Sequence, residues 1–315
     1  MEQTNWPYSN SFGNPTESFS SIISQPATIV HRTLRRNLHW VGSALALTGV
    51  GFVAQRLSHY AAGADFSRFS ATSWLFVSGV CLAYALAGLM LACGWRNVVG
   101  HLGTTISTRA AVGIYGVAQL AKYVPGNVLH LAGRQALGIA AGIPGWTLAK
   151  SAVWELALLA TAAAGFGLLT LPLLEPACPM ALSLGAFAAL IGLAAGLAKH
   201  LIGPRVARAF AWYTVFLGIS GLIFVALLTI VRDPPMDGSL PWLPVCGAYV
   251  LAWLGGLVTP GAPAGIGVRE LALLFLLKGL VSEEDLVVAI LLGRIVTVSG
   301  DIFFCLFASF ISRRP

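Results

Sequence analysis

Residues 121–134, AKYVPGNVLHLAGR, interrupt a long apolar region with a proline–glycine pair, a lysine, a histidine and an arginine. Proline removes a backbone amide donor and glycine permits a tight turn, so no continuous helix is expected through Pro125 and Gly126. In hydrocarbon, each backbone group freed by the break would carry a desolvation penalty. A break of this kind is therefore expected where protein buries it or where it lines a wet cavity.

A second interruption, TPGAPAGIGVREL, spans residues 259–271. An arginine follows the proline by nine residues in both stretches, Arg134 after Pro125 and Arg269 after Pro260. Paired interruptions in an apolar chain are typical of a binding site at the interface of an internal repeat. Proline–glycine pairs are also common in membrane proteins, so an internal repeat and an unrelated pair of breaks both remain open.

The composition places these breaks in a membrane protein. The chain of 315 residues is 57% hydrophobic and 10% charged, whereas a soluble domain carries about 25% charged residues. We predict an all-α, polytopic integral membrane helix bundle over residues 31–315, preceded by a polar, disordered, cytoplasmic tail over residues 1–30. The net charge of +7 does not indicate nucleic-acid binding, because the basic residues lie at the ends of apolar runs.

Hydropathy predicts about eight membrane crossings. The uninterrupted candidates are 38–57, 73–93, 146–172, 180–198, 209–231, 242–258 and 285–311. Thirteen of the 19 Lys and Arg residues then fall on one side, which the positive-inside rule makes cytoplasmic, with both termini inside. This topology requires 107–141 to form a re-entrant hairpin on the cytoplasmic side and 260–281 to complete a crossing.

Several charged residues lie inside or beside apolar segments. Glu155 lies near the start of one span, Arg269 and Glu270 follow the second break, and Arg294 and Asp301 share the last span. Intramembrane charges are usually functional or paired. Two interpretations stay open: an ion-paired scaffold, such as Arg294 with Asp301 or Glu155 with Arg134, and a polar cavity that contacts substrate.

No enzyme motif accompanies these charges. The chain has no GxxxxGK[ST], nucleophile elbow or HExxH sequence, and its cysteines show no zinc-type spacing. We therefore predict no catalytic residues, no metal and no cofactor.

The sequence QLAKYVPGNVLHLAGR, the later Glu155, TPGAPAGIGVREL and the late Gly-Arg at 293–294 resemble the lysylphosphatidylglycerol synthase transmembrane-region family. The family includes the flippase half of the bacterial multiple peptide resistance factor and stand-alone membrane proteins encoded near glycosyltransferases. The resemblance covers roughly residues 38–311, and this chain lacks the aminoacyl-transferring domain of the two-part enzymes. It departs in one motif, since PGAPAGIGVRE stands where the family more often has a Gly-Gly pair after the proline.

The resemblance implies a multi-pass protein of the bacterial inner membrane that moves or presents lipid-linked head groups. It implies substrate-binding roles for Lys122, Arg134, Glu155, Arg269, Glu270 and Arg294. It implies structural breaks at Pro125, Gly126, Pro260, Gly261, Gly265 and Gly267. The implied partners are membrane lipids, either anionic or polyprenyl-phosphate-linked.

The leading functional hypothesis is a flippase-like translocase of lipids or lipid-linked glycans, in which arginines at broken helices bind the head-group phosphate. Arginine suits this role because its planar fork binds phosphate oxygens bidentately and stays charged. Two alternatives remain: a non-transporting accessory protein for a glycosyltransferase or cell-envelope enzyme, and an ion-coupled transporter of small solutes.

Overall fold

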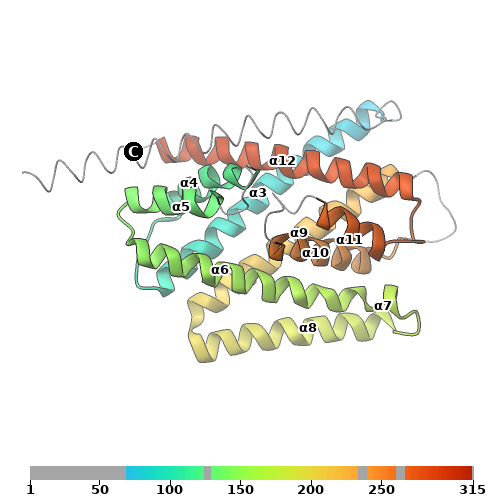
Figure 1. Ribbon diagram of the computed structural model, residues 1–315, viewed down its shortest axis with the longest axis horizontal. Coiled ribbons are helices and arrows are strands. Elements are labelled where there is room, and N and C mark those ends of the chain that lie inside the picture. The colour runs from blue at the N-terminus through green and yellow to red at the C-terminus, as the bar shows by residue number, and fades with distance from the viewer. Residues whose placement is uncertain (1–68, 124–128, 233–239, 260–266, 314–315) are drawn as a thin grey trace, which may run out of the picture.

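The computed structural model describes residues 69–123, 129–232, 240–259 and 267–313, and every element in these ranges is a helix (Figure 1). The α-helices are α3 (Ala71–His101), α4 (Thr108–Gln119), α5 (Leu129–Ala140), α6 (Gly145–Phe166), α7 (Leu171–Leu174), α8 (Met180–Leu197), α9 (Pro204–Val231), α10 (Trp242–Val258), α11 (Val268–Leu276) and α12 (Glu283–Arg313). Three short tighter or wider turns extend them: η1 (Leu120–Tyr123), η2 (Gly167–Thr170) and η3 (Ala198–Ile202).

Five helical segments are long and apolar enough to cross a membrane: Ala71–His101, Gly145–Leu174, Met180–Ile202, Pro204–Val231 and Glu283–Ser312. They contain five of the predicted spans, which confirms an all-helical chain compatible with a multi-pass membrane protein. The predicted span 242–258 coincides with α10, a shorter apolar helix. The predicted span 38–57 and the tail 1–30 lie outside the described residues. The total of eight crossings stays a prediction.

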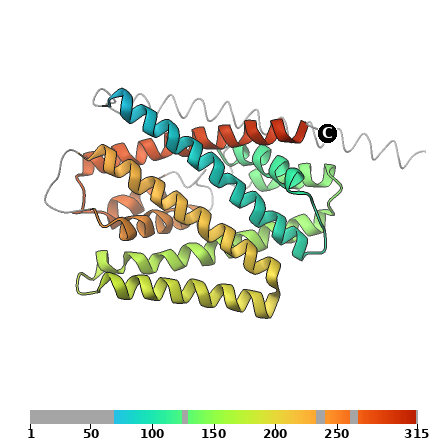
Figure 2. The ribbon, with the colours of Figure 1, turned by 180° about the vertical axis from the view of Figure 1, so that it is seen from behind.

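The two long helices α3 and α9 pack side by side in opposite directions, as Figure 2 shows. The end of α3 meets the start of α9, where Arg205 donates a hydrogen bond to the Gly100 carbonyl. Further along, Gly94 faces the ring of Tyr213, and the rings of Tyr84 and Phe216 lie 6.0 Å apart. Small residues such as Gly94 allow the close helix approach that membrane bundles use in place of a strong hydrophobic effect.

The α4–α5 segment forms a hairpin that enters and leaves at one end of the bundle. Ser107 caps α4, whose Gly113 and Gly116 pack on Ser312 and Ala308 near the end of α12. Helix α5 then returns along α4 and reaches the start of α6, where Gly138 faces Leu148. The residues between the two arms, 124–128, lie outside the described ranges. The predicted interruption therefore separates two helices, as the proline–glycine pair indicates.

A second hairpin, α10–α11, starts from the opposite end. Gly247 of α10 packs on Leu169 and Thr170 at the far end of the α6 segment, and the end of α10 meets Val268 at the start of α11. Helix α11 packs back on α10. Because α11 has nine residues, about 14 Å at 1.5 Å per residue, it does not by itself complete the crossing predicted for 260–281.

The order long helix, hairpin, long helix therefore occurs twice, first as α3, α4–α5, α6 and then as α9, α10–α11, α12 (Figure 1). The helix directions are reversed between the two sets, since α3 and α9 are antiparallel and the hairpins start from opposite ends. An inverted repeat of this kind places the two sequence interruptions in corresponding positions.

Candidate functional site

A cavity of about 120 Å³ lies where the two hairpins approach each other. Its walls include Tyr84, Glu155, Phe216 and Arg294, each near the middle of a long helix. The cavity therefore lies halfway along the bundle. The remaining lining residues come from both hairpins and from α3, α6 and α12: Leu91, Tyr115, Gln119, Lys122, Tyr123, His130, Leu131, Arg134, Leu156, Leu159, Trp253, Gly256, Leu257, Arg269 and Thr297.

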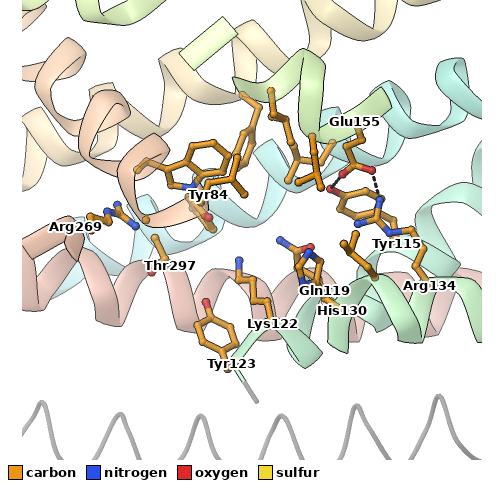
Figure 3. A pocket seen from close by; sticks show the side chains of 18 of the residues that line it. Tyr84, Tyr115, Gln119, Lys122, Tyr123, His130, Arg134, Glu155, Arg269 and Thr297 are labelled. Carbon is orange, nitrogen blue, oxygen red and sulfur yellow. Dashed lines mark hydrogen bonds and ion pairs between the residues drawn. The ribbon is translucent and has the colours of Figure 1, made fainter. Parts of the chain in front are cut away.

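Arg134 and Glu155 form a buried ion pair at one end of the cavity (Figure 3). The Tyr115 hydroxyl donates a hydrogen bond of 2.7 Å to the other oxygen of Glu155, and the guanidinium lies over the Tyr115 ring, 4.2 Å from its centroid. The ring centroid of Trp95 lies 5.7 Å from the same guanidinium carbon. The indole N–H donates a hydrogen bond of 3.1 Å to the Ser151 hydroxyl. One of the two scaffold pairs considered from sequence is thus present.

A second ion pair joins Lys122 to Asp301, with 2.7 Å between Nζ and Oδ2. The Tyr123 hydroxyl donates to the same carboxylate oxygen. Lys122 and Tyr123 end the first arm of the α4–α5 hairpin, and Asp301 lies on α12, so this cluster fastens the hairpin to the last long helix. The ion-pair partner of Asp301 in the described structure is thus Lys122 of the hairpin. The pair of Asp301 with Arg294, considered from sequence, is not among the described ion pairs.

A third ion pair joins Glu270 to Arg294, whose Nε donates 2.7 Å to Glu270 Oε1. The other oxygen of Glu270 accepts a hydrogen bond of 2.6 Å from the Gly267 amide just before the first residue of α11. Gly267 has φ of 88°, a conformation that glycine adopts without the steric penalty of a side chain. Glu270 therefore caps the start of α11 and also holds Arg294 at the cavity.

Arg269 differs from the other three cations. Its side chain is 8% exposed and lines the cavity. Within the described residues, no carboxylate pairs with it and it makes no hydrogen bond. Its recorded contact is the ring of Tyr249, 4.2 Å from the guanidinium carbon. A buried cation without a counter-ion is strongly disfavoured, so this position is suited to an external anion.

The two hairpins repeat one local arrangement. Arg134 stacks on Tyr115, which precedes it by 19 residues, and Arg269 stacks on Tyr249, which precedes it by 20, with the same 4.2 Å separation. The halves differ in one respect, since Glu155 neutralises Arg134 whereas Arg269 has no such partner on the described part of α12. Figure 3 shows Arg269 and Arg134 at opposite ends of the cavity, with Lys122, Gln119 and His130 between them.

Unpartnered polar atoms face the same space. His130 Nδ1 and Arg134 Nε are buried and have no hydrogen-bond partner in the described structure. Gln119, 8% exposed, lines the cavity and has no recorded hydrogen bond to a described residue. Buried polar groups are normally paired, so these atoms indicate a ligand or water in the cavity.

Five of the six residues proposed for binding line the cavity: Lys122, Arg134, Glu155, Arg269 and Arg294. Glu270 reaches it through Arg294. Among the expected breaks, Gly267 begins α11, while Pro125, Gly126, Pro260, Gly261 and Gly265 lie outside the described residues.

The sequence analysis did not single out Tyr115, Tyr249 and Gln119, whose types are ordinary in apolar helices. The similar spacing of the two tyrosines before the two arginines, 19 and 20 residues, is a signal that would have found the first two. In the described ranges no group of three metal-ligating side chains occurs.

No protein-family model matches the chain, and no curated protein matches it. The resemblance to the lysylphosphatidylglycerol synthase transmembrane-region family therefore rests on the two interruptions and their arginines.

Proposed function

We propose that the protein is a flippase-like translocase that moves an anionic lipid, or the anionic head of a lipid-linked glycan, across the bacterial inner membrane. The observation that carries the proposal is Arg269, a buried arginine that faces a mid-bundle cavity without a counter-ion. A head-group phosphate would supply the missing charge, and the guanidinium fork suits phosphate oxygens.

The depth of the cavity supports this proposal. A lipid that crosses the bilayer has to bring a charged head group through about 30 Å of hydrocarbon. Seven Lys, Arg, Asp and Glu side chains at or beside the cavity provide a polar environment halfway through the bundle. The head group would use this environment while the acyl or prenyl chains stay in the lipid.

The two hairpins have opposite orientations, which suits a transporter whose site opens to each side of the membrane in turn. In this proposal α4–α5 and α10–α11 are re-entrant segments that enter from opposite faces of the membrane and meet at the cavity. Two similar gates of opposite orientation would open the site alternately to each face. With the predicted span 38–57, this proposed topology has six full crossings, in place of the eight expected from hydropathy, and keeps both termini on one side.

The orientation follows from the charges of the described helices. One end of the bundle, here called the basic end, carries Arg96, Arg109, Lys150, Lys199, Arg205 and Arg208. The opposite end, called the acidic end, carries Glu175, Glu283, Glu284 and Asp285 together with Arg232 and Lys278. The positive-inside rule assigns the basic end to the cytoplasm, which agrees with the proposed cytoplasmic N-terminus.

The test is lipid translocation in liposomes by the purified full-length chain. A fluorescent anionic phospholipid is placed in both leaflets, and its exposure to an impermeant quencher is followed with time. Wild type is expected to make the inner-leaflet probe accessible. Arg269→Gln is expected to lower the rate at least about tenfold, since a hydrogen bond to a charged group contributes roughly 1.5–3 kcal/mol.

Arg208→Gln is the matched control, because Arg208 is exposed at the basic end and donates only to the Pro204 carbonyl. It is expected to retain the wild-type rate. A folded wild-type protein that moves no lipid would contradict the proposal and favour the accessory protein for a glycosyltransferase or cell-envelope enzyme. Full activity of Arg269→Gln would exclude the proposed role of this arginine.

A further inference from the structure

The side chains around the cavity carry one more positive charge than negative charges. Four cations, Lys122, Arg134, Arg269 and Arg294, face three carboxylates, Glu155, Asp301 and Glu270. Each carboxylate is paired with one cation, which leaves Arg269. The neighbouring residues outside the described ranges, 124–128 and 260–266, contain no ionisable side chain. The described wall therefore has a formal net charge of +1.

We infer that the ligand is a monoanionic phosphodiester head group, small and hydroxyl-bearing, held by Arg269. This inference rests on the proposed function and narrows its substrate class. A phosphodiester has one negative charge and brings the site to neutrality. A phosphomonoester, with about −1.5 to −2 at neutral pH, would overcompensate, and a zwitterionic head group would leave the buried +1 in place.

The size of the cavity limits the head group. A protein cavity of about 150 Å³ holds a benzene molecule, so 120 Å³ suits a phosphate with at most a short substituent. An oligosaccharide is larger than this volume and would extend beyond the cavity. Small head groups are thus favoured over large glycans.

The polar atoms between the two arginines suit the substituent on the phosphate. Gln119 offers an amide, His130 an unpaired ring nitrogen and Arg134 an unpaired Nε–H. These groups lie away from Arg269 along the cavity (Figure 3). A phosphate at Arg269 would direct its alcohol substituent toward them, where hydroxyl groups could both donate and accept hydrogen bonds.

The test compares lipids of defined charge on the full chain. Purified protein is equilibrated with vesicles that contain equal amounts of phosphatidylglycerol, phosphatidic acid and phosphatidylcholine, and the retained lipids are measured by mass spectrometry. Wild type is expected to enrich phosphatidylglycerol at least about tenfold over phosphatidylcholine and severalfold over phosphatidic acid. Arg269→Gln, with a neutral wall, is expected to lose the enrichment.

A second experiment adds a positive charge to the cavity wall and asks whether the preferred lipid changes. Gln119→Lys raises the formal charge of the wall to +2 without removing a recorded hydrogen bond, so it is expected to shift retention toward phosphatidic acid. Ala177→Lys, which adds the same charge at an exposed position that does not line the cavity, is the matched control and is expected to keep the wild-type order. An unchanged lipid order in Gln119→Lys would contradict the charge argument.

The outcomes separate the inference from the function on which it rests. Wild type that retains phosphatidic acid or phosphatidylcholine as well as phosphatidylglycerol overturns the inference, while lipid translocation can still stand. Retention of no lipid above bulk composition overturns both. Glycerophosphoglycerol, the same head group without acyl chains, is added as a competitor. If it displaces the lipid at equal concentration, the charge inference stands and the ligand is a soluble phosphodiester.

Discussion

The carboxylates around the cavity control which cation remains available to a ligand. Glu155 neutralises Arg134 and accepts a further hydrogen bond from Tyr115. Asp301 neutralises Lys122, and Glu270 neutralises Arg294. A buried pair is well placed to resist change, since removal of one partner leaves an uncompensated charge. Arg269 lacks such a partner, and we therefore assign the anion to this residue.

Glu155→Gln is expected to destabilise the protein by about 3–5 kcal/mol, because it leaves the Arg134 charge buried without its carboxylate. Thermal unfolding in detergent, followed by tryptophan fluorescence, measures the loss. Glu284→Gln, at an exposed position in the first turn of α12, is the control and should change stability by no more than about 0.5 kcal/mol.

A double variant, Glu155→Gln with Arg134→Met, should recover part of that loss, since it removes both charges. If Glu155→Gln is as stable as Glu284→Gln, the pair does not have the buried geometry described here.

Ser151→Ala is expected to cost about 1–3 kcal/mol, because the buried Trp95 indole N–H loses its acceptor. The same unfolding assay applies. Ser78→Ala serves as the matched variant, since its exposed hydroxyl donates only to the Trp74 carbonyl of the same helix. Equal stability of the two variants would show that the indole finds another acceptor.

At the level of helices, close packing depends on small residues at the crossing points. Gly88 of α3 faces the Phe304 ring of α12, Gly94 faces the Tyr213 ring of α9, and Gly221 of α9 faces Cys246 of α10. These contacts fix α3 and α9 in their antiparallel arrangement and place the two hairpins on opposite sides of the cavity. The hairpins themselves pack on long helices, so their positions depend on the same crossings.

Gly94→Ala is expected to destabilise the bundle by about 1–3 kcal/mol, since the added Cβ would overlap the ring of Tyr213. Gly79→Ala in the same helix is the control. Its Cβ meets no atom within 4 Å, and alanine favours a helix interior by about 0.5–1 kcal/mol over glycine. Opposite changes in unfolding temperature are therefore predicted, and a drop of equal size in both variants would contradict the described α3–α9 contact.

In the described part of the chain, the basic and acidic ends lie at opposite ends of the long helices, with the cavity between them. The two hairpins start from different ends, which makes the cavity the meeting point of two similar halves. In our proposal this arrangement lets one site face each side of the membrane in turn. The orientation of the bundle is then a prediction about the entire chain.

Labelling of single cysteines in intact cells tests the orientation. In a variant without the five native cysteines, Ala177→Cys at the acidic end is expected to react with an impermeant maleimide. Lys199→Cys at the basic end is expected to react only with a permeant one. Both positions are exposed. The reverse pattern would overturn the proposed cytoplasmic location of the basic end.

The sequence predicted much of this fold because hydropathy and chain breaks are local signals. Runs of apolar residues located the five long helices, whereas the two proline–glycine pairs lie outside the described residues. It placed 260–281 in a crossing, whereas α11 is short and packs back on α10. Hydropathy does not distinguish a crossing helix from a hairpin arm, because both are apolar along their length.

The sequence predicted which charged residues lie at the site, but not which of them form ion pairs with one another. The charges at Lys122, Arg134, Glu155, Arg269, Glu270 and Arg294 are evident in an apolar chain, and each lies at or beside the cavity. Sequence spacing left Arg294 open as one partner for Asp301, yet Asp301 accepts a hydrogen bond from Tyr123, 178 residues away, and pairs with Lys122. Proximity between distant segments is set by helix crossings, and no local pattern records it.

Composition and hydropathy thus determined that the chain is helical, with segments apolar enough for a multi-pass membrane protein, because burial in lipid constrains each segment separately. The tertiary structure decided that three of the four cavity cations are paired with carboxylates and that Arg269 has no such partner among the described residues. The physical reason is that electrostatic pairing depends on distances of a few ångströms between side chains, which exist only once the helices have packed.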